Sequence, residues 1–146
     1  RVPVALWCTK TSSENEEDEC YLMDGSGYIF EKGENANFIK YHGLIEGAPI
    51  GKLYLDGTFR NFSKSIAELV GASGRSISEV TIDEHSDVYA TFVNGGYVLF
   101  PLQAEYHDLT DNVASVFASE RFKTNAELDY ADFRFGNKVY VKFKGE

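Results

Sequence analysis

The C-terminal segment from Tyr130 to Phe143 constrains the fold more than any other part of the chain, because its apolar residues alternate on both sides of a turn signal. We place a three-residue loop at Gly136, Asn137 and Lys138, since glycine and asparagine tolerate the positive φ that such a loop needs. This loop predicts a β-hairpin with apolar residues opposite one another on one face. The predicted pairs are Phe135 with Val139, Phe133 with Val141 and Ala131 with Phe143.

The opposite face of this hairpin would pair Arg134 with Tyr140 and Asp132 with Lys142, which suits a solvated surface. A loop with an even number of residues would place the two charged residues Arg134 and Asp132 opposite valines and mix charge into the core face. We therefore predict two sets of side chains: a buried set of Phe133, Phe135, Val139, Val141 and Phe143, and an outward set of Asp132, Arg134, Tyr140 and Lys142.

Turn signals recur between short apolar runs along the chain, as an antiparallel β protein requires. Glycine-containing turns at 24–27, 55–58 and 93–96 predict hairpins. Two segments have helical spacing instead: a helix capped by Ser63 that places Ile66, Leu69 and Val70 on one face, and a longer stripe from Tyr106 to Phe117. The pattern predicts that residues 1–146 form a single α+β domain, mainly an antiparallel β-sheet with two packed helices.

Composition narrows the range of partners. A chain of 146 residues can bury a sufficient core without a metal or a disulfide. Twenty-three acidic residues against fourteen basic ones give a net charge of −9, which opposes binding to nucleic acid or to an anionic membrane surface. The apolar runs are too short to span a bilayer and no signal-peptide pattern is present. Because the chain begins with Arg1, we expect it to be a fragment of a longer protein.

Two cysteines, Cys8 and Cys20, lie at the inner ends of two strand-like runs that flank an acidic polar loop from Thr9 to Glu19. If Cys8 faces Cys20, Leu6 faces Leu22 on the same side and Trp7 faces Tyr21 on the other, so one register aligns the sulfurs and the apolar pairs. We predict a disulfide and hence an oxidising compartment. Two reduced, buried thiols are the alternative.

The chain carries few residue patterns typical of a chemical site. His42, His85 and His107 are scattered without the spacing of a zinc site, so no metal site is predicted. The acidic run from Glu14 to Glu19 lacks the ligand pattern of a calcium loop and is interpreted as solvated. The turn at Asp24 lacks the Lys-Ser/Thr of a phosphate-binding loop. We expect no cofactor, no small-molecule substrate and no enzymatic activity.

The final strand, from Lys138 to Lys144, has no later strand to cover its far side, so its backbone groups are open to another chain unless an earlier strand pairs there. Its outward positions alternate as Lys138, Tyr140, Lys142 and Lys144. Two interpretations remain open. The lysines can protect a sheet edge from aggregation, or they can form a basic ledge for an acidic partner peptide.

Two motifs near the ends of the chain resemble those of a known family. The segment from Asp132 to Tyr140 (DFRFGNKVY) is similar to the closing hairpin of the FtsQ/DivIB cell-division proteins. The segments from Arg1 to Trp7 (RVPVALW) and from Leu22 to Phe30 (LMDGSGYIF) resemble the start of that family's β domain. The resemblance implies an extracytoplasmic β domain, with a cytoplasmic tail, one transmembrane helix and a polypeptide-transport-associated domain upstream.

The same resemblance implies a non-catalytic scaffold at the extracytoplasmic face of the cell membrane, which helps to assemble the machinery that builds the septum. Its partners would be FtsB-like and FtsL-like division proteins, and the FtsB-like partner would add a strand to the last strands of this domain. Carried over by motif position, the contact residues are Arg134, Phe135, Asn137, Tyr140 and Phe143, supported from the core by Val139 and Val141.

Two other functions remain as alternatives. A secreted hydrolase or ligand-binding domain would need a deep pocket around Glu31, His42, Asp56 or His85. An envelope interaction module unrelated to division would share the edge strand but not the partner.

Overall fold

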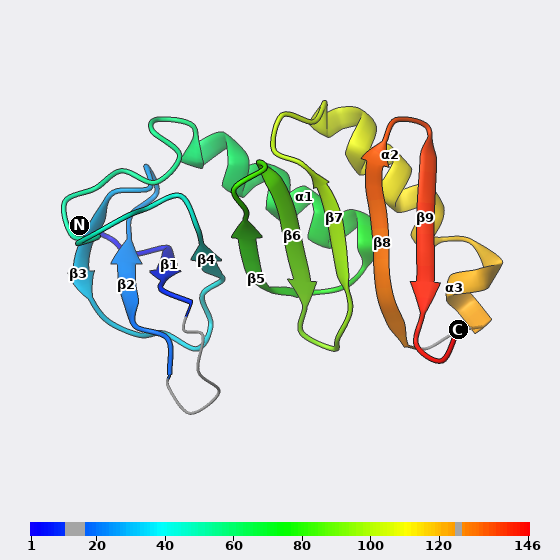
Figure 1. Ribbon diagram of the computed structural model, residues 1–146, viewed down its shortest axis with the longest axis horizontal. Helices are drawn as coiled ribbons and strands as arrows, with labels where there is room; N and C mark the ends of the chain where they lie inside the picture. The colour runs from blue at the N-terminus through cyan, green and yellow to red at the C-terminus, as the bar shows by residue number, and fades with distance from the viewer. Residues whose placement is uncertain (11–16, 125–126) are drawn as a thin grey trace.

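The computed structural model describes residues 1–10, 17–124 and 127–146, and these residues form one continuous sheet flanked by helices (Figure 1). The predicted acidic loop lies partly outside the described residues, at positions 11–16. The strands are β1 (Ala5–Cys8), β2 (Cys20–Met23), β3 (Ile29–Lys32), β4 (Lys40–His42), β5 (Ile77–Ile82), β6 (Asp87–Phe92), β7 (Tyr97–Pro101), β8 (Leu128–Phe135) and β9 (Lys138–Phe143). The helices are α1 (Phe59–Ser73), α2 (Tyr106–Phe117) and α3 (Glu120–Thr124).

The sheet is mixed, so the predicted fold class was wrong. Its nine described strands lie in the order β3-β2-β1-β4-β5-β6-β7-β8-β9. The pairings β1–β4, β4–β5 and β7–β8 are parallel, and in the described residues three helices accompany the sheet rather than two. Parallel neighbours need a long crossover connection. Here α1 carries the chain from β4 to β5, and α2 with α3 carries it from β7 to β8.

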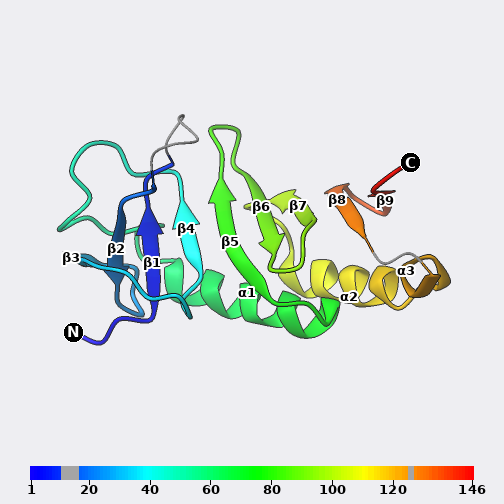
Figure 2. The same ribbon diagram turned by 90° about the horizontal axis from the view of Figure 1, so that it is seen from below.

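Both predicted helices form, on the same face of the sheet (Figure 2). The helix α1 begins at Phe59, four residues before the predicted cap, and ends at Gly74, whose φ of 69° is the left-handed conformation typical of a helix end. The helix α2 spans the predicted apolar stripe. The predicted hairpin at 55–58 was wrong, because these residues are turns that lead into α1.

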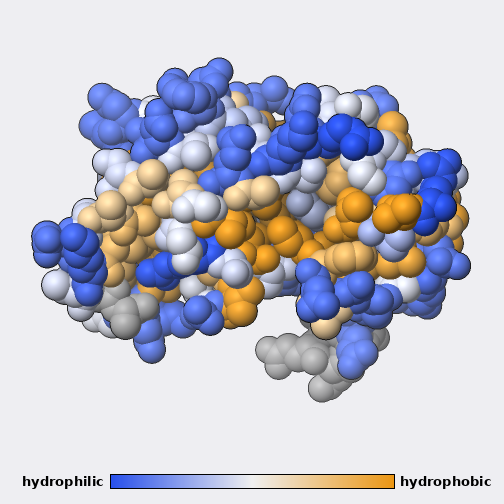
Figure 3. All heavy atoms as spheres, turned by 180° about the vertical axis from the view of Figure 1, so that it is seen from behind, coloured by the Kyte–Doolittle hydropathy of each residue, from blue (hydrophilic) through white to orange (hydrophobic). Residues whose placement is uncertain are grey.

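The core lies between the sheet and the helices. Apolar side chains of α1 and α2 pack on the central strands, and Tyr41 of β4 contacts Phe59 edge to face, with ring centroids 5.1 Å apart. On the face that carries the helices, apolar residues gather across the middle of the surface and hydrophilic residues lie around them (Figure 3).

The predicted disulfide and its register are confirmed. Cys8 and Cys20 are bonded, and they pair directly in the β1–β2 ladder together with Leu6 and Leu22. The sulfurs and Leu6 form a small apolar cluster on the side of the sheet opposite the main core. Trp7 points the other way into the main core, where its indole donates a hydrogen bond to the carbonyl of Gly43 at 3.0 Å.

The turn between β2 and β3 is organised by one carboxylate. Asp24 Oδ1 accepts hydrogen bonds from the Ser26 backbone N–H at 2.9 Å, the Ser26 hydroxyl at 2.6 Å and the Tyr28 N–H at 3.2 Å. Its other oxygen binds the Arg1 guanidinium at 2.8 Å. Burial by itself would raise the pKa of Asp24, but these four contacts favour the charged form and lower the pKa to about 2.

We expect Asp24→Asn to destabilise the protein by about 1–2 kcal/mol at pH 7. Because the pKa of Asp24 is lower in the folded state, its stabilising effect is complete above about pH 4 and is lost as the pH falls toward 2. Urea unfolding at pH 7 and at pH 2.5 measures this difference. The exposed Asp56→Asn is the control, and a penalty for Asp24→Asn that stays constant over this pH range would contradict the prediction.

A candidate partner-binding edge

The strand β9 is the last strand of the sheet, as predicted, and no other strand pairs with its far side in the described part of the chain (Figure 1). An edge strand presents a row of backbone N–H and C=O groups to solvent or to another chain. The β9 edge is therefore the first candidate for a binding surface.

The register of this hairpin differs from the prediction. The loop has two residues, Gly136 and Asn137, with Phe135 opposite Lys138, and the glycine supplies the positive φ of 65°. A β-bulge between Asp132 and Phe135 then shifts the pairing, so that Asp132 faces Tyr140 and not Lys142. As a result Phe135 is 50% exposed and Asp132 is 6% exposed, the reverse of their predicted positions.

The rest of the predicted burial is partly confirmed. Phe133 and Phe143 are buried and Tyr140 is exposed, as expected. Val139 and Val141 are half-buried and pack against the core, and Lys142 is half-buried beside Asp129, with 3.6 Å between the ammonium and the carboxylate.

An ion-pair network holds the bulge. Arg134 binds both carboxylate oxygens of Asp132, at 3.0 and 2.8 Å, and reaches Asp87 of β6 at 3.1 Å. These bonds, those with Asp132 above all, raise the pKa of Arg134 and keep it charged. Arg134 also lies over the Phe135 ring, 5.3 Å from its centroid, so the predicted contact with Tyr140 is replaced by one with Phe135. The network fixes the base of the exposed hairpin tip.

Alternation along β9 decides which backbone groups face outward. The Lys144 N–H donates to the Glu127 carbonyl on the β8 side at 2.9 Å, so Tyr140 and Lys142, an even number of residues away, also face β8. The backbone groups of Val139 and Val141 therefore point away from the sheet. Arg121 of α3 confirms this direction, because its guanidinium donates to the Val141 carbonyl at 3.3 Å. Within the described residues, the outward groups of Val139 and the outward N–H of Val141 remain for pairing.

The exposed aromatic side chains gather at the hairpin tip. Phe135 and Tyr140 contact edge to face, with ring centroids 5.4 Å apart, and are 50% and 53% exposed. Asn137 is exposed in the loop beside them. Phe143 instead packs under Phe122 of α3 at 5.0 Å, so only its backbone faces the edge.

A groove of about 540 Å³ adjoins the tip, between the start of α2 and the hairpin. Its lining includes Arg134, Asn137, Glu105, Asp108 and Asp111. The three acidic residues were not predicted as site residues, because only the folded chain brings the first turns of α2 next to the β8–β9 loop.

The opposite edge of the sheet is covered by the chain itself. The Ile29 N–H of β3 donates to the Lys52 carbonyl at 2.9 Å, and the Ile29 carbonyl accepts from Gly51 at 2.7 Å. Leu53 forms a further bridge with Tyr28. This segment blocks strand addition next to Ile29, whereas the described contacts on the outer edge of β9 lie at its C-terminal end, where Arg121 donates to the Val141 carbonyl and the Glu146 N–H donates to the Phe143 carbonyl.

None of the residues named for a hydrolase or ligand site lines the groove beside the hairpin tip, and they lie apart from one another. His42 is buried in β4, while Glu31 lies on β3, with β1 and β2 between them. His85 is exposed in the polar turn that joins β5 and β6, and Asp56 is exposed in the turn before α1.

Comparison with protein-family models and with curated proteins finds no match for this chain. In the described residues, no helix combines the length and the apolar character needed to cross a membrane.

Proposed function

We propose that this domain is a non-catalytic scaffold of the FtsQ/DivIB type, which binds an extended segment of an FtsB-like partner by strand addition to β9. The observation that carries the proposal is the open β9 edge beside an exposed aromatic pair, on a sheet whose other edge is covered near Ile29. The resemblance of the two terminal motifs supports the choice of partner. On this proposal an FtsL-like protein joins the complex, and the full-length protein is anchored in the cell membrane with this domain outside.

The geometry supports a short, specific pairing. A partner strand beside β9 gains the N–H and C=O of Val139 and the N–H of Val141, each hydrogen bond contributing about 0.5–1.5 kcal/mol net. The Phe135 and Tyr140 rings add apolar contact area at the same end of the strand. Arg121 occupies the Val141 carbonyl, so pairing past this point requires that Arg121 move or that the partner strand end there.

Charge supports an acidic partner segment. Lys138 and Lys142 lie on one face of β9, where Lys142 also contacts Asp129, and Lys144 directly follows the strand, on a chain of net charge −9. An acidic peptide is attracted to this basic strip, and the net negative charge of the chain disfavours its binding elsewhere. The disulfide supports the extracytoplasmic location, because such bonds persist in oxidising compartments.

The test of strand addition is the substitution Val141→Pro. Proline removes the outward N–H and its ring occupies the space of the partner strand, while edge strands tolerate proline in the fold. We expect Val141→Pro to weaken binding of the extracytoplasmic part of an FtsB-like partner at least tenfold. Isothermal titration calorimetry measures the affinity, and the amide NMR signals of residues 134–144 locate the contact.

The matched control is Val141→Ala, which loses the same packing contacts and keeps the N–H. It should bind within about threefold of the unchanged domain, since it keeps the outward hydrogen bond that Val141→Pro loses. Tyr140→Ala should weaken binding without unfolding the domain, because Tyr140 is 53% exposed. Equal affinities for Val141→Pro and Val141→Ala, or amide shifts confined to another face, would reject strand addition at β9.

A further inference from the structure

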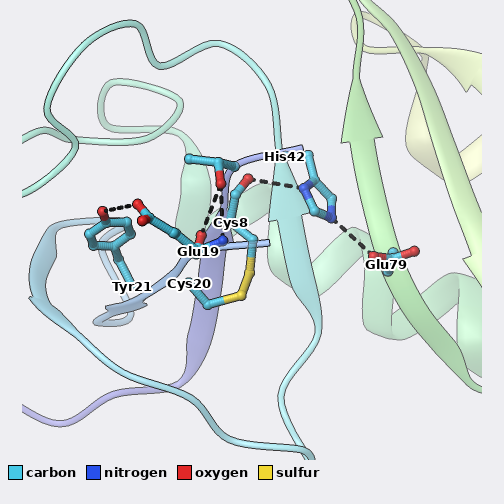
Figure 4. Close-up of a disulfide and its surroundings, with 7 residues drawn as sticks. Cys8, Glu19, Cys20, Tyr21, His42 and Glu79 are labelled. Carbon is cyan, nitrogen blue, oxygen red and sulfur yellow. Dashed lines mark hydrogen bonds and ion pairs between the residues drawn. A yellow bond between two sulfur atoms is a disulfide. The ribbon is translucent and has the colours of Figure 1, made fainter. Parts of the chain in front are cut away.

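Among the described residues, His42 is the one buried histidine, with 1% of its surface exposed. It lies at the end of β4 next to the disulfide, and its two ring nitrogens face two different oxygen atoms (Figure 4). Nδ1 lies 2.9 Å from the Cys8 carbonyl, and Nε2 lies 3.1 Å from Oε1 of Glu79 on β5. Both neighbours are hydrogen-bond acceptors.

The two acceptors determine which ring nitrogen of His42 carries the proton. A carbonyl oxygen can only accept a hydrogen bond, so the proton of a neutral imidazole belongs on Nδ1. The lone pair of Nε2 then points at the Glu79 carboxylate 3.1 Å away, so a cation placed beside these two electron-rich atoms would be held by both. That cation is either a second proton or a metal ion. A backbone carbonyl that orients Nδ1–H is the usual support of a histidine that binds metal through Nε2.

A third ligand group completes the cluster. Asp18, in the segment before β2, brings a carboxylate oxygen to the same place, and the ligand atoms of Asp18, His42 and Glu79 all lie within 4.8 Å of one another. Two ligands bound to one zinc ion at about 2.0–2.1 Å and near-tetrahedral angles lie roughly 3.3 Å apart, close to the observed separation of Nε2 and Oε1.

We propose that Asp18, His42 and Glu79 form a binding site for a divalent transition-metal ion, with Zn²⁺ as the best match. One imidazole and two carboxylates suit a borderline ion such as Zn²⁺, whereas Mg²⁺ and Ca²⁺ prefer all-oxygen sites with more ligands. Water fills the fourth position. The site is separate from the β9 edge, since β5, β6, β7 and β8 lie between β4 and β9 in the sheet.

The metal would act as a second cross-link beside the disulfide. Cys8 and Cys20 join β1 to β2, whereas the proposed ligands join the segment before β2 to β4 and to β5. The parallel β4–β5 pairing has three residue pairs, so a metal bridge there ties the N-terminal strands to the rest of the sheet. Binding to the folded state alone stabilises it by mass action.

The direct test is titration of the metal-free domain with Zn²⁺ at neutral pH, followed by calorimetry and by the imidazole nitrogen signals of His42. We expect one ion per chain, a dissociation constant in the micromolar range or below, and a shift of the Nε2 signal while Nδ1 stays protonated. Glu79→Gln and Asp18→Asn, which leave the buried ring in place, should each weaken binding at least tenfold.

The controls are the two exposed histidines, each of which has a carboxylate nearby. His85 lies 3.5 Å from Glu84, and His107 lies 3.6 Å from Asp111. The double variant His85→Gln/His107→Gln should keep the full affinity. The proposal would be overturned if zinc left the His42 signals unmoved. It would also be overturned if binding survived Glu79→Gln and Asp18→Asn but was lost in the histidine double variant.

Discussion

Gly43→Ala should destabilise the protein by about 3–5 kcal/mol, the largest loss expected from so small a change of side chain. Gly43 follows β4 with a φ of 96°, which alanine rarely adopts, and a Cβ at this position would lie 2.1 Å from the carbonyl oxygen of Ile82. That oxygen cannot retreat easily, because β5 is paired on both sides, with β4 and with β6. Trp7 also relies on the Gly43 carbonyl as the acceptor for its indole N–H.

Gly57→Ala separates the two causes. Gly57 has a similar φ of 90°, but a Cβ added to it would meet no atom within 4 Å. This variant should lose about 1 kcal/mol, the conformational penalty alone. Urea unfolding of both variants gives the difference in the free energy of unfolding. Similar losses for Gly43→Ala and Gly57→Ala would mean that the backbone near Ile82 adapts and that the junction between β4 and β5 tolerates a shift.

The sequence predicted local pairing better than sheet topology. Cys8 and Cys20 could be matched because β1 and β2 are neighbours in sequence, and their register aligns Leu6 with Leu22 as well. No sequence pattern indicated the parallel pairing of β4 with β5 or of β7 with β8. A crossover helix has the same amphipathic pattern whichever strands it joins. The existence of α1 and α2 was therefore predictable, whereas the short α3 and the sheet order were not.

The β9 hairpin shows where the alternation of apolar residues predicts burial correctly and where it does not. Val139, Val141 and Phe143 turn toward the core, as their spacing indicates. A bulge adds one residue to one strand without changing the alternation of the other, so its position cannot be found from period two alone. The sequence signal that was missed is the spacing of two residues between Asp132 and Arg134. In the fold the Arg134 guanidinium forms a bidentate ion pair with the Asp132 carboxylate, and the carboxylate is buried.

The proposed metal site was missed for a related reason. His42, Glu79 and Asp18 come from three separate segments, and none of the spacings typical of zinc sites joins them. Only the parallel pairing of β4 with β5 places His42 next to Glu79. Sites assembled across a sheet from single residues leave no motif.

Loss of the disulfide is the second large effect that we expect. Cys8→Ala/Cys20→Ala should lower the free energy of unfolding by about 3 kcal/mol, because the bond closes a loop between residues twelve apart in sequence and restricts the unfolded chain. Both cysteines are buried, so the variant also loses some packing in the cluster with Leu6. Guanidinium unfolding of the oxidised domain and of the variant measures the sum of these two terms.

Reduction of the disulfide separates the effect of the cross-link from the effect of packing, since it breaks the bond and leaves both sulfur atoms in place. The reduced domain should show most of the loss in stability of the double variant, and reducing agent should not change the variant at all. Unfolding of the reduced chain should also show a steeper dependence on denaturant, because an uncrosslinked denatured state exposes more surface. Mass spectrometry verifies that the disulfide is reduced. If the unfolding midpoint of the reduced domain is nevertheless unchanged, the prediction is wrong, and Leu6, Leu22 and the Trp7–Tyr21 contact hold the register of β1 and β2 without the disulfide.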